Sequence, residues 1–381
     1  MATRKGQQPT YSATIPQKRV VTDRILYTDA WETPGIFALG LNNESSFGFA
    51  NGPGGPNQPY EWLLDTRLDR TDAINTAALT SDSTSVTMTV DSGTNFQVGD
   101  IVLVDLEYMH ITAISTHALT VTRAYGGTQA THANSAGVTI VGRARVEGTD
   151  STDSAWTEAT SATNATQIFH KEIDISRSAA NLQRYGIGNL VEREIDKAMT
   201  ELLGLLNLTL YHGQRKAGSA STVSAMGGLE TYISTNINTL SSTPALTEAN
   251  IQDELQDCWD AGGAPDLILC NSWGKRKVAS FYAGAIRTER SERMGGMVID
   301  RIQGSVDGNE LNLVLDRHCP TDSLYILDTS TCGFVTIDPF FWEPLGKVGD
   351  TAAFGQVVGE YSFVLARENW MSAVVGFSTS A

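Results

Sequence analysis

The sequence predicts a mixed α+β fold, and three features of the 381-residue chain carry that prediction. Apolar residues recur every three or four positions over residues 187–206, a spacing that predicts one long amphipathic helix. Short segments between residues 73 and 142 alternate apolar and polar side chains, which predicts a small all-β unit. From about residue 297 onward, strand patterns dominate.

The first segment is basic and poor in large apolar groups. Residues 1–24 carry five Lys or Arg against one Asp, and they include Pro9 and Pro16. Such a segment cannot bury a core of its own, so we expect an extended arm.

A loop and a long excursion follow the arm. The Gly- and Pro-rich residues 52–59 cannot continue a helix or a central strand. We expect a strand near residues 61–68 and return strands near 143–147 and 167–175, separated by a polar stretch at 149–166. The chain thus makes a two-stranded excursion with a domain inserted at its tip.

Five short strands are expected in that inserted domain, which predicts a small barrel or sandwich. They lie near residues 86–90, 101–106, 108–114, 119–121 and 138–141. His110, His117 and His132 also lie here, but no carboxylate or Cys stands at ligand spacing. We therefore expect ordinary surface or packed histidines and no metal site.

After the long helix, which should end at His212 and Gly213, the chain alternates helix and strand. Thr247 is expected to cap a second helix that stops at Gly262 and Gly263. A buried strand over residues 266–270 and a helix near 273–282 should follow.

Composition and charge exclude several classes of protein. The net charge is −16, which opposes a general cationic grip on nucleic acid or an anionic membrane. No apolar run is long enough for a membrane span, and no signal peptide is expected. The four cysteines form no CxxC pair, which favours buried thiols in a reducing compartment. Only 18% of residues are charged, which suggests that much of the surface meets other protein.

The sequence holds no assembled catalytic motif. Ser272 and Lys275 match S-x-x-K, but the companion motifs S-D-N and K-T-G are absent, so a helix start is the better interpretation. Gly304 to Gly308 reads as a turn, because its Ser directly follows the first Gly. We expect no enzyme activity and no cofactor.

Several segments carry a resemblance to a known family. They are VIDRI at 298–302, LNLVLDR at 311–317, LGKVGD within 341–350, VGEYSFVLAREN at 358–369 and NATQI at 164–168. Together with the order of arm, excursion, long helix and mixed domain, they resemble the major capsid protein of tailed bacteriophages. The fold implied is HK-ninety-seven-like, in its SU-ten-like branch with a β-domain inserted in the E-loop.

That resemblance implies a division of the chain. The N-terminal arm would be residues 1–35, and the E-loop with its flanks would be 36–72 and 143–176. The inserted β-domain would be 73–142. The peripheral domain with its spine helix would be 177–230 and 338–381, and the axial domain 231–337. Some members of the family cross-link through an E-loop Lys, but here the first Lys is Lys171 at the loop's base, so that chemistry is not carried over.

The resemblance also implies function and partners. Hexamers and pentamers of the chain would form an icosahedral head enclosing double-stranded DNA, in the virion capsid and assembled in the cytoplasm of a bacterial host. A scaffolding protein, a portal and a cement protein are the implied partners, together with packaged DNA bound non-specifically and no membrane.

Candidate interface residues follow from charge and aromatic content. Trp62 and Trp156 are candidate anchors of the E-loop on a neighbour, and Arg19 and Arg67 are basic candidates. Arg287, Arg290 and Arg293 are the candidate acceptor for acidic neighbours. For any single charge, a solvated face is the plainer interpretation.

Two alternatives remain open from the sequence. The first is an encapsulin-like nanocompartment shell, which has the same fold with enzyme cargo, although the large E-loop insertion favours a phage. The second is an enzyme of unknown activity or a β-rich adhesin. The missing catalytic constellation opposes the enzyme, and the long internal helix opposes the adhesin.

Overall fold

A computed structural model describes most of the chain from residue 32 onward, so the expected extended arm over residues 1–24 lies outside the described residues. The described residues are 32–41, 59–75, 78–80, 83–148, 156–182, 188–240, 244–281, 287–291, 297–303, 308, 310–346, 349 and 351–379. They divide into two compact units. The small β unit is Leu63–Ser161, and the main unit comprises the chain on either side, through Trp62 and from Ala162.

A seven-stranded mixed sheet forms the core of the main unit, in the order β10-β18-β15-β11-β14-β13-β12. Two neighbouring pairs, β10 with β18 and β11 with β14, are parallel, and the others are antiparallel. The strands are β10 (Ile237–Thr239), β11 (Leu267–Cys270), β12 (Arg287–Ser291), β13 (Met297–Gln303), β14 (Glu310–Leu315), β15 (Ser323–Leu327) and β18 (Ser372–Val375). All four residues of β11 are buried, as the apolar run predicts for a central strand.

Helices cover both faces of this sheet. On one face, α5 (Glu248–Asp260) and α6 (Ser272–Phe281) pack through Ile251, Leu255 and Val278. The other face shares a core with α1 (Pro34–Ala38), α3 (Leu190–His212) and α4 (Leu229–Tyr232). A further short helix, α2 (Arg177–Asn181), follows the last strand of the excursion.

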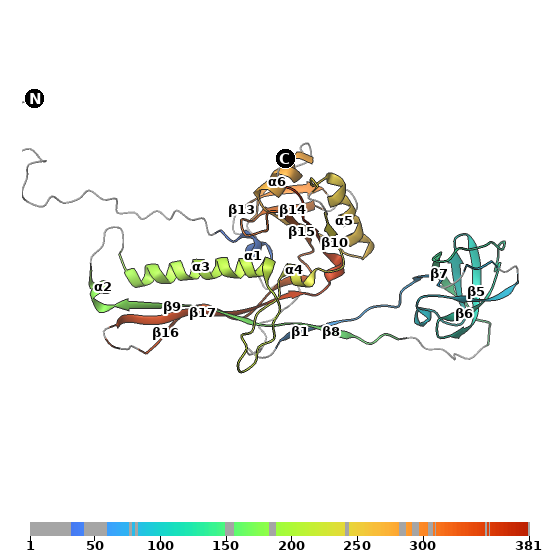
Figure 1. Cartoon of the computed structure of the whole chain (residues 1–381), viewed down its shortest axis with the longest axis horizontal. Helices are drawn as coiled ribbons and strands as arrows, with labels where there is room; N and C mark the ends of the chain where they lie inside the picture. The colour runs from blue at the N-terminus through green and yellow to red at the C-terminus, as the bar shows by residue number, and fades with distance from the viewer. Residues whose placement is uncertain are drawn as a thin grey trace, which may run out of the picture. The chain divides into compact units, whose positions relative to one another are not determined.

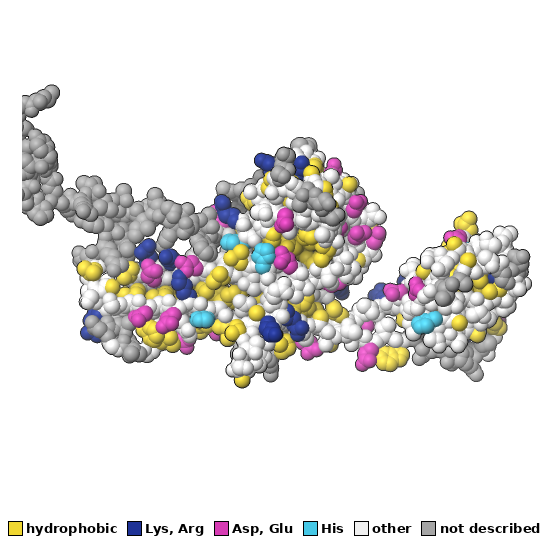
Figure 2. All heavy atoms as spheres, viewed as in Figure 1, with side chains coloured by type: hydrophobic (Ala, Val, Ile, Leu, Met, Phe, Trp, Pro, Cys, Tyr) yellow, Lys and Arg dark blue, Asp and Glu magenta, His cyan; other side chains and the backbone are white. Residues whose placement is uncertain are grey.

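The helix α3 lies along a second sheet, of order β16-β17-β9 (Figure 1). Its strands are β9 (Gln167–Ser176), β16 (Cys332–Pro344) and β17 (Thr351–Leu365). Figure 2 shows apolar side chains in yellow between α3 and this sheet. Ala198, Leu202, Leu206 and Leu210 of the helix are buried at helical spacing. Each buried Leu stabilises the pairing by roughly 1.5–3 kcal/mol.

The small β unit contains one antiparallel sheet of six strands, in the order β2-β7-β4-β5-β6-β3. They are β2 (Thr71–Ala73), β3 (Ser85–Thr89), β4 (Asp100–Val104), β5 (Glu107–Ser115), β6 (Ala118–Thr122) and β7 (Gly137–Arg143). A bridge between Ile74 and Val90 joins the ends of the two edge strands. Alternate side chains such as Val102, Met109, Ile111 and Val121 fill a core that is separate from the main one.

Most of the predicted elements are present, with one correction to the excursion and one to the small β unit, which has six strands and not five because the short β2 was not predicted. The long helix ends at His212 with Gly213 as its C-cap, and Thr247 caps α5 in a capping box with Asn250. The return strand opposite β1 (Tyr60–Leu64) is β8 (Thr160–Asn164), not the expected segment near 143–147. Arg143 instead ends β7, and residues 144–148 form no strand.

Candidate functional site

The strand pair β1-β8 is the first candidate site. A two-stranded sheet is only marginally stable alone in water, so this pair needs support from other parts of its own chain or from another molecule. Its base is anchored on the main unit. The Trp62 indole lies 6.0 Å from the Tyr232 ring, centroid to centroid, and the Tyr232 hydroxyl donates a hydrogen bond to the carbonyl of Thr163 at 2.9 Å. Burial raises the pKa of Tyr232 to about 12, so this hydroxyl remains a donor at neutral pH.

Asn164, the last residue of β8, holds the same base from inside. Its side-chain amide donates to the carbonyls of Gly227 (3.0 Å) and Phe363 (2.6 Å). Its oxygen accepts from the backbone N–H groups of Ala165 and Gly227, both at 2.8 Å. One fully buried side chain therefore ties the excursion to β17 and to the loop before α4.

Two large apolar side chains of the segment Leu63–Ser161, next to these strands in the sequence, are exposed. Leu63 in β1 is 74% exposed and Trp156, just before β8, is 75% exposed. The Thr157 hydroxyl donates to the carbonyl of Thr66 at 2.6 Å, which holds the two segments together. Large apolar groups on an extended ribbon indicate a surface that another molecule covers.

A buried carboxylate joins three elements of the main unit. Asp316 follows β14, and its Oδ2 accepts from the Gly35 N–H (3.0 Å), the Asn207 amide (2.8 Å) and the Tyr211 hydroxyl (2.9 Å). A Cβ on Gly35 would lie 2.5 Å from that oxygen, so only glycine allows this approach. Burial, with the charge of Asp316, raises the pKa of Tyr211 far above its usual range. The segment of α1 is thereby fixed to α3 and to the large sheet.

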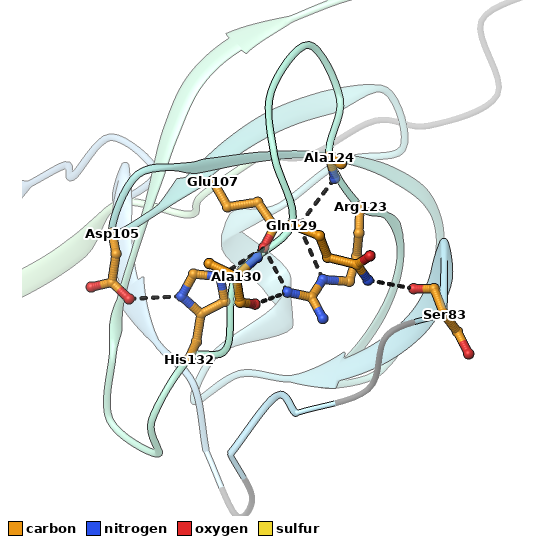
Figure 3. Close-up of polar contacts among 8 residues, drawn as sticks. All are labelled: Ser83, Asp105, Glu107, Arg123, Ala124, Gln129, Ala130 and His132. Atoms are coloured by element: carbon orange, nitrogen blue, oxygen red, sulfur yellow. Dashed lines mark hydrogen bonds and ion pairs between the residues drawn. The ribbon is translucent and has the colours of Figure 1, made fainter.

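Glu107, Arg123 and His132 form a buried ion-paired network in the small β unit, and the exposed Asp105 lies at its outer end (Figure 3). The Glu107 carboxylate accepts from the Arg123 guanidinium at 2.6 and 3.0 Å and lies 2.9 Å from His132 Nε2. His132 Nδ1 is 2.7 Å from Asp105. Burial alone raises the pKa of Glu107, but the hydrogen bonds from Arg123, Ala130, His132 and Ala124 lower it to about 2.

This network is closed and its groups are already paired, so we interpret it as structural. It fixes the β4–β5 turn to the segment from Arg123 to His132. His132 is packed, as expected, but the two carboxylates beside it were missed, because they lie 25 and 27 positions away in sequence. Among the described residues, no group of three or more His, Cys, Asp or Glu is placed to hold a metal ion.

The predicted interface residues fall into three groups. Trp156 and Arg67 are exposed. Trp62 is only 8% exposed, because it packs on its own chain. Of the two predicted anchors, Trp156 is therefore the exposed one. Leu63, which was not predicted from the sequence, is exposed as well. Arg287 and Arg290 lie in β12 opposite Arg301 and Val298 of β13, whereas Arg19 and Arg293 lie outside the described residues.

All four cysteines are buried and free, and burial raises the pKa of each thiol. At Cys270 burial outweighs the nearby positive charge of Lys275, and the raised pKa values of all four thiols disfavour the reactive thiolate. No helix among the described residues is long and apolar enough to cross a membrane.

The chain was compared with known protein families and solved structures. A family model described as SU10 major capsid protein matches residues 8–377. The capsid asymmetric unit of Cyanophage A-1(L) is similar over 97% of this chain and 98% of that chain, with 14% identity and a TM-score of 0.51. A search of the curated proteins found no match.

Two other solved structures are less similar. The structure titled Mycobacterium phage Bobi is 14% identical, with a TM-score of 0.41 and coverage of 80% of this chain and 88% of that chain. The SrpI encapsulin of Synechococcus elongatus is 9% identical, with a TM-score of 0.45 and coverage of 59% of this chain and 78% of that chain. At these scores neither likeness bears on function.

Proposed function

Because the chain belongs to the SU10 major capsid protein family and is the major capsid protein of a tailed bacteriophage, we propose that it assembles as hexamers and pentamers into an icosahedral head that encloses double-stranded DNA. Self-association is the activity of the family, and the virion capsid is its location. Assembly in the host cytoplasm, with a scaffolding protein, a portal and a cement protein, completes the proposal. We assign the chain no catalytic role.

The observation that carries the assembly proposal is the uncovered ribbon around β1 and β8. Its base is held by Asn164 and Trp62, while Leu63 and Trp156 expose most of their surface. A single copy leaves this apolar area in water, so a neighbouring copy that covers it gains the free energy of burial. We therefore assign the ribbon to the E-loop, lying over a neighbour, with residues 73–142 as a domain inserted in it.

The experiment replaces the two exposed anchors together, Leu63→Ser and Trp156→Ser. We expect folded chains whose assembled fraction, measured by sedimentation, falls at least about tenfold, because roughly 3 kcal/mol of burial per neighbour is lost. The matched control is Val223→Ser, another strongly exposed apolar residue, on the hairpin before α4. Normal assembly of the double variant would contradict the ribbon's role.

Two further experiments test the basic cluster and the inserted β-domain. Changing Arg287, Arg290 and Arg293 to Glu should block assembly while the chain still folds. A normal yield of assembled particles would overturn the pairing of these residues with acidic neighbours.

Deleting residues 75–141 should leave the chain able to assemble if the β-domain projects outward as decoration. Failure of that deletion to assemble would assign lattice contacts to the β-domain.

A further inference from the structure

Charge is arranged in two consecutive blocks in the second half of the chain. Residues 217–274 contain seven Asp or Glu and no Lys or Arg. Residues 275–293 then contain six Lys or Arg against two Glu. The acidic block and the basic block therefore fall on different helices and strands. Whether the two blocks lie close together depends on the fold.

The large sheet keeps the two blocks apart. The helix α5 packs on β18, next to the edge strand β10, whereas α6 packs on β11 and β14, toward the edge formed by β13 and β12. Both helices contribute to the same buried cluster, so they cover one face of the sheet. Figure 1 shows them at separate places on this layer, and Figure 2 shows magenta side chains gathered over α5 and dark blue ones over α6.

The outer face of α5 carries three exposed acidic residues and no basic residue. Asp253, Asp257 and Asp260 are exposed, at positions four and three residues apart that share one side of the helix. Trp259 beside them is 49% exposed. We call Asp253, Asp257, Trp259 and Asp260 the acidic edge.

The outer face of α6 is basic. Arg276 is exposed, and the Lys277 ammonium lies 5.9 Å from the ring centroids of both Trp273 and Phe281, which hold it on the helix surface. We call Arg276 and Lys277 the basic edge.

We propose that the acidic edge of one copy binds the basic edge of the next copy, side by side around a ring. The inference rests on the proposed assembly and names the surfaces that join neighbours within a capsomer. Opposite charges at two separate places on one face of the sheet suit a heterologous contact that closes by rotation, whereas two like edges repel each other. Exposed ion pairs are individually weak, so the ring gains its strength from repetition, with Trp259 as an apolar contact within the charged surface.

The direct test is a cross-link between copies. All four native cysteines are buried, so Asp257→Cys and Arg276→Cys each add one accessible thiol. Co-assembled chains that carry one substitution each should form a disulfide-linked dimer of the two variants under mild oxidation. Chains that carry both should form a ladder up to the ring size. Dimers formed by the Asp257→Cys variant alone would place two acidic edges together and overturn the proposal, as would the absence of any cross-link in assembled shells.

Charge reversal separates this inference from the proposed function. Asp253, Asp257 and Asp260 changed to Lys should weaken assembly about tenfold or more, and Arg276→Glu with Lys277→Glu should do the same. The two sets combined in one chain should restore assembly, which a merely misfolded variant would not do. If both charge-reversed variants assemble as well as the wild-type chain, the acidic and basic edges do not join neighbouring copies. The proposed capsid function would stand in that case. If the wild-type chain forms no shell with its partner genes, the proposed function itself fails.

Discussion

Three buried carboxylates show how local surroundings decide what one residue does. Glu107 is surrounded by donors, and its pKa falls to about 2. Asp316 accepts hydrogen bonds from α1 and α3 and fixes both helices to the end of β14. Glu254, on the inner face of α5, is 4% exposed, and one of its oxygens has no hydrogen-bond partner among the described residues. Burial, with the neighbouring charge of Asp257, raises the pKa of Glu254 to about 7.

Glu254→Gln should therefore stabilise the chain in a pH-dependent way. The folded chain binds this proton more tightly than the unfolded chain, whose Glu has its ordinary pKa of about 4.5, so ionisation destabilises the folded state as pH rises through 7. We expect the variant to raise the free energy of unfolding by roughly 2–3 kcal/mol at pH 8.5. The gain should fade between pH 7 and pH 4.5. Urea unfolding at both ends of this range measures it, with the exposed Asp260→Asn as control.

Arg123→Met tests the opposite case. The substitution leaves the Glu107 carboxylate buried without its main partner, which costs about 3–5 kcal/mol. Because the folded pKa of Glu107 is depressed, the network stabilises the unit above pH 4.5 and loses that contribution as pH falls toward 2. Hydrogen exchange at the Ala124 and Ala130 amides should accelerate strongly at pH 7. Unchanged exchange in the variant would show that the network contributes little.

At the scale of elements, the base of the β1-β8 ribbon depends on a single amide. Asn164→Ala removes the partners of the Gly227 N–H and of two buried carbonyls, which should cost about 2–4 kcal/mol. Limited proteolysis should then cut the ribbon near residues 160–164 faster than in the wild-type chain. Thr160→Ala, which removes only an exposed contact, is the matched control. Equal cleavage of the two variants would contradict the anchoring role of Asn164.

The elements that the sequence predicts well are those specified locally. The periodicity of α3 and the capping box at Thr247 act within a few residues, so both helices begin and end near their predicted positions. The strand β8 reads Thr-Ser-Ala-Thr-Asn and has no apolar alternation; its partner lies about a hundred residues away, and no local pattern reveals it.

The candidate site was predictable only in part, for the same reason. Aromatic content selected both Trp62 and Trp156, but only packing against Tyr232 distinguishes the buried one from the exposed one. The acidic and basic edges are blocks in the sequence, yet their separation across one sheet comes from the strand order. The pairing of His132 with Glu107 and Asp105 likewise comes from turns that meet only in the folded unit.

At the scale of the whole molecule, three features of the chain suit an assembly. Few of its residues are charged, a ribbon exposes large apolar groups, and two helices on one sheet carry exposed charges of opposite sign. Each feature is unfavourable for a single copy in water, and each favours contact between copies. The family match over residues 8–377 agrees with this account.

Electron microscopy of particles formed when the chain is expressed with its neighbouring genes tests the central claim most directly. We predict closed shells built of hexamers and pentamers, with nucleic acid inside when the packaging genes are present. Uniform small particles under the same conditions, with no rings and no shells, would contradict assembly into a phage head.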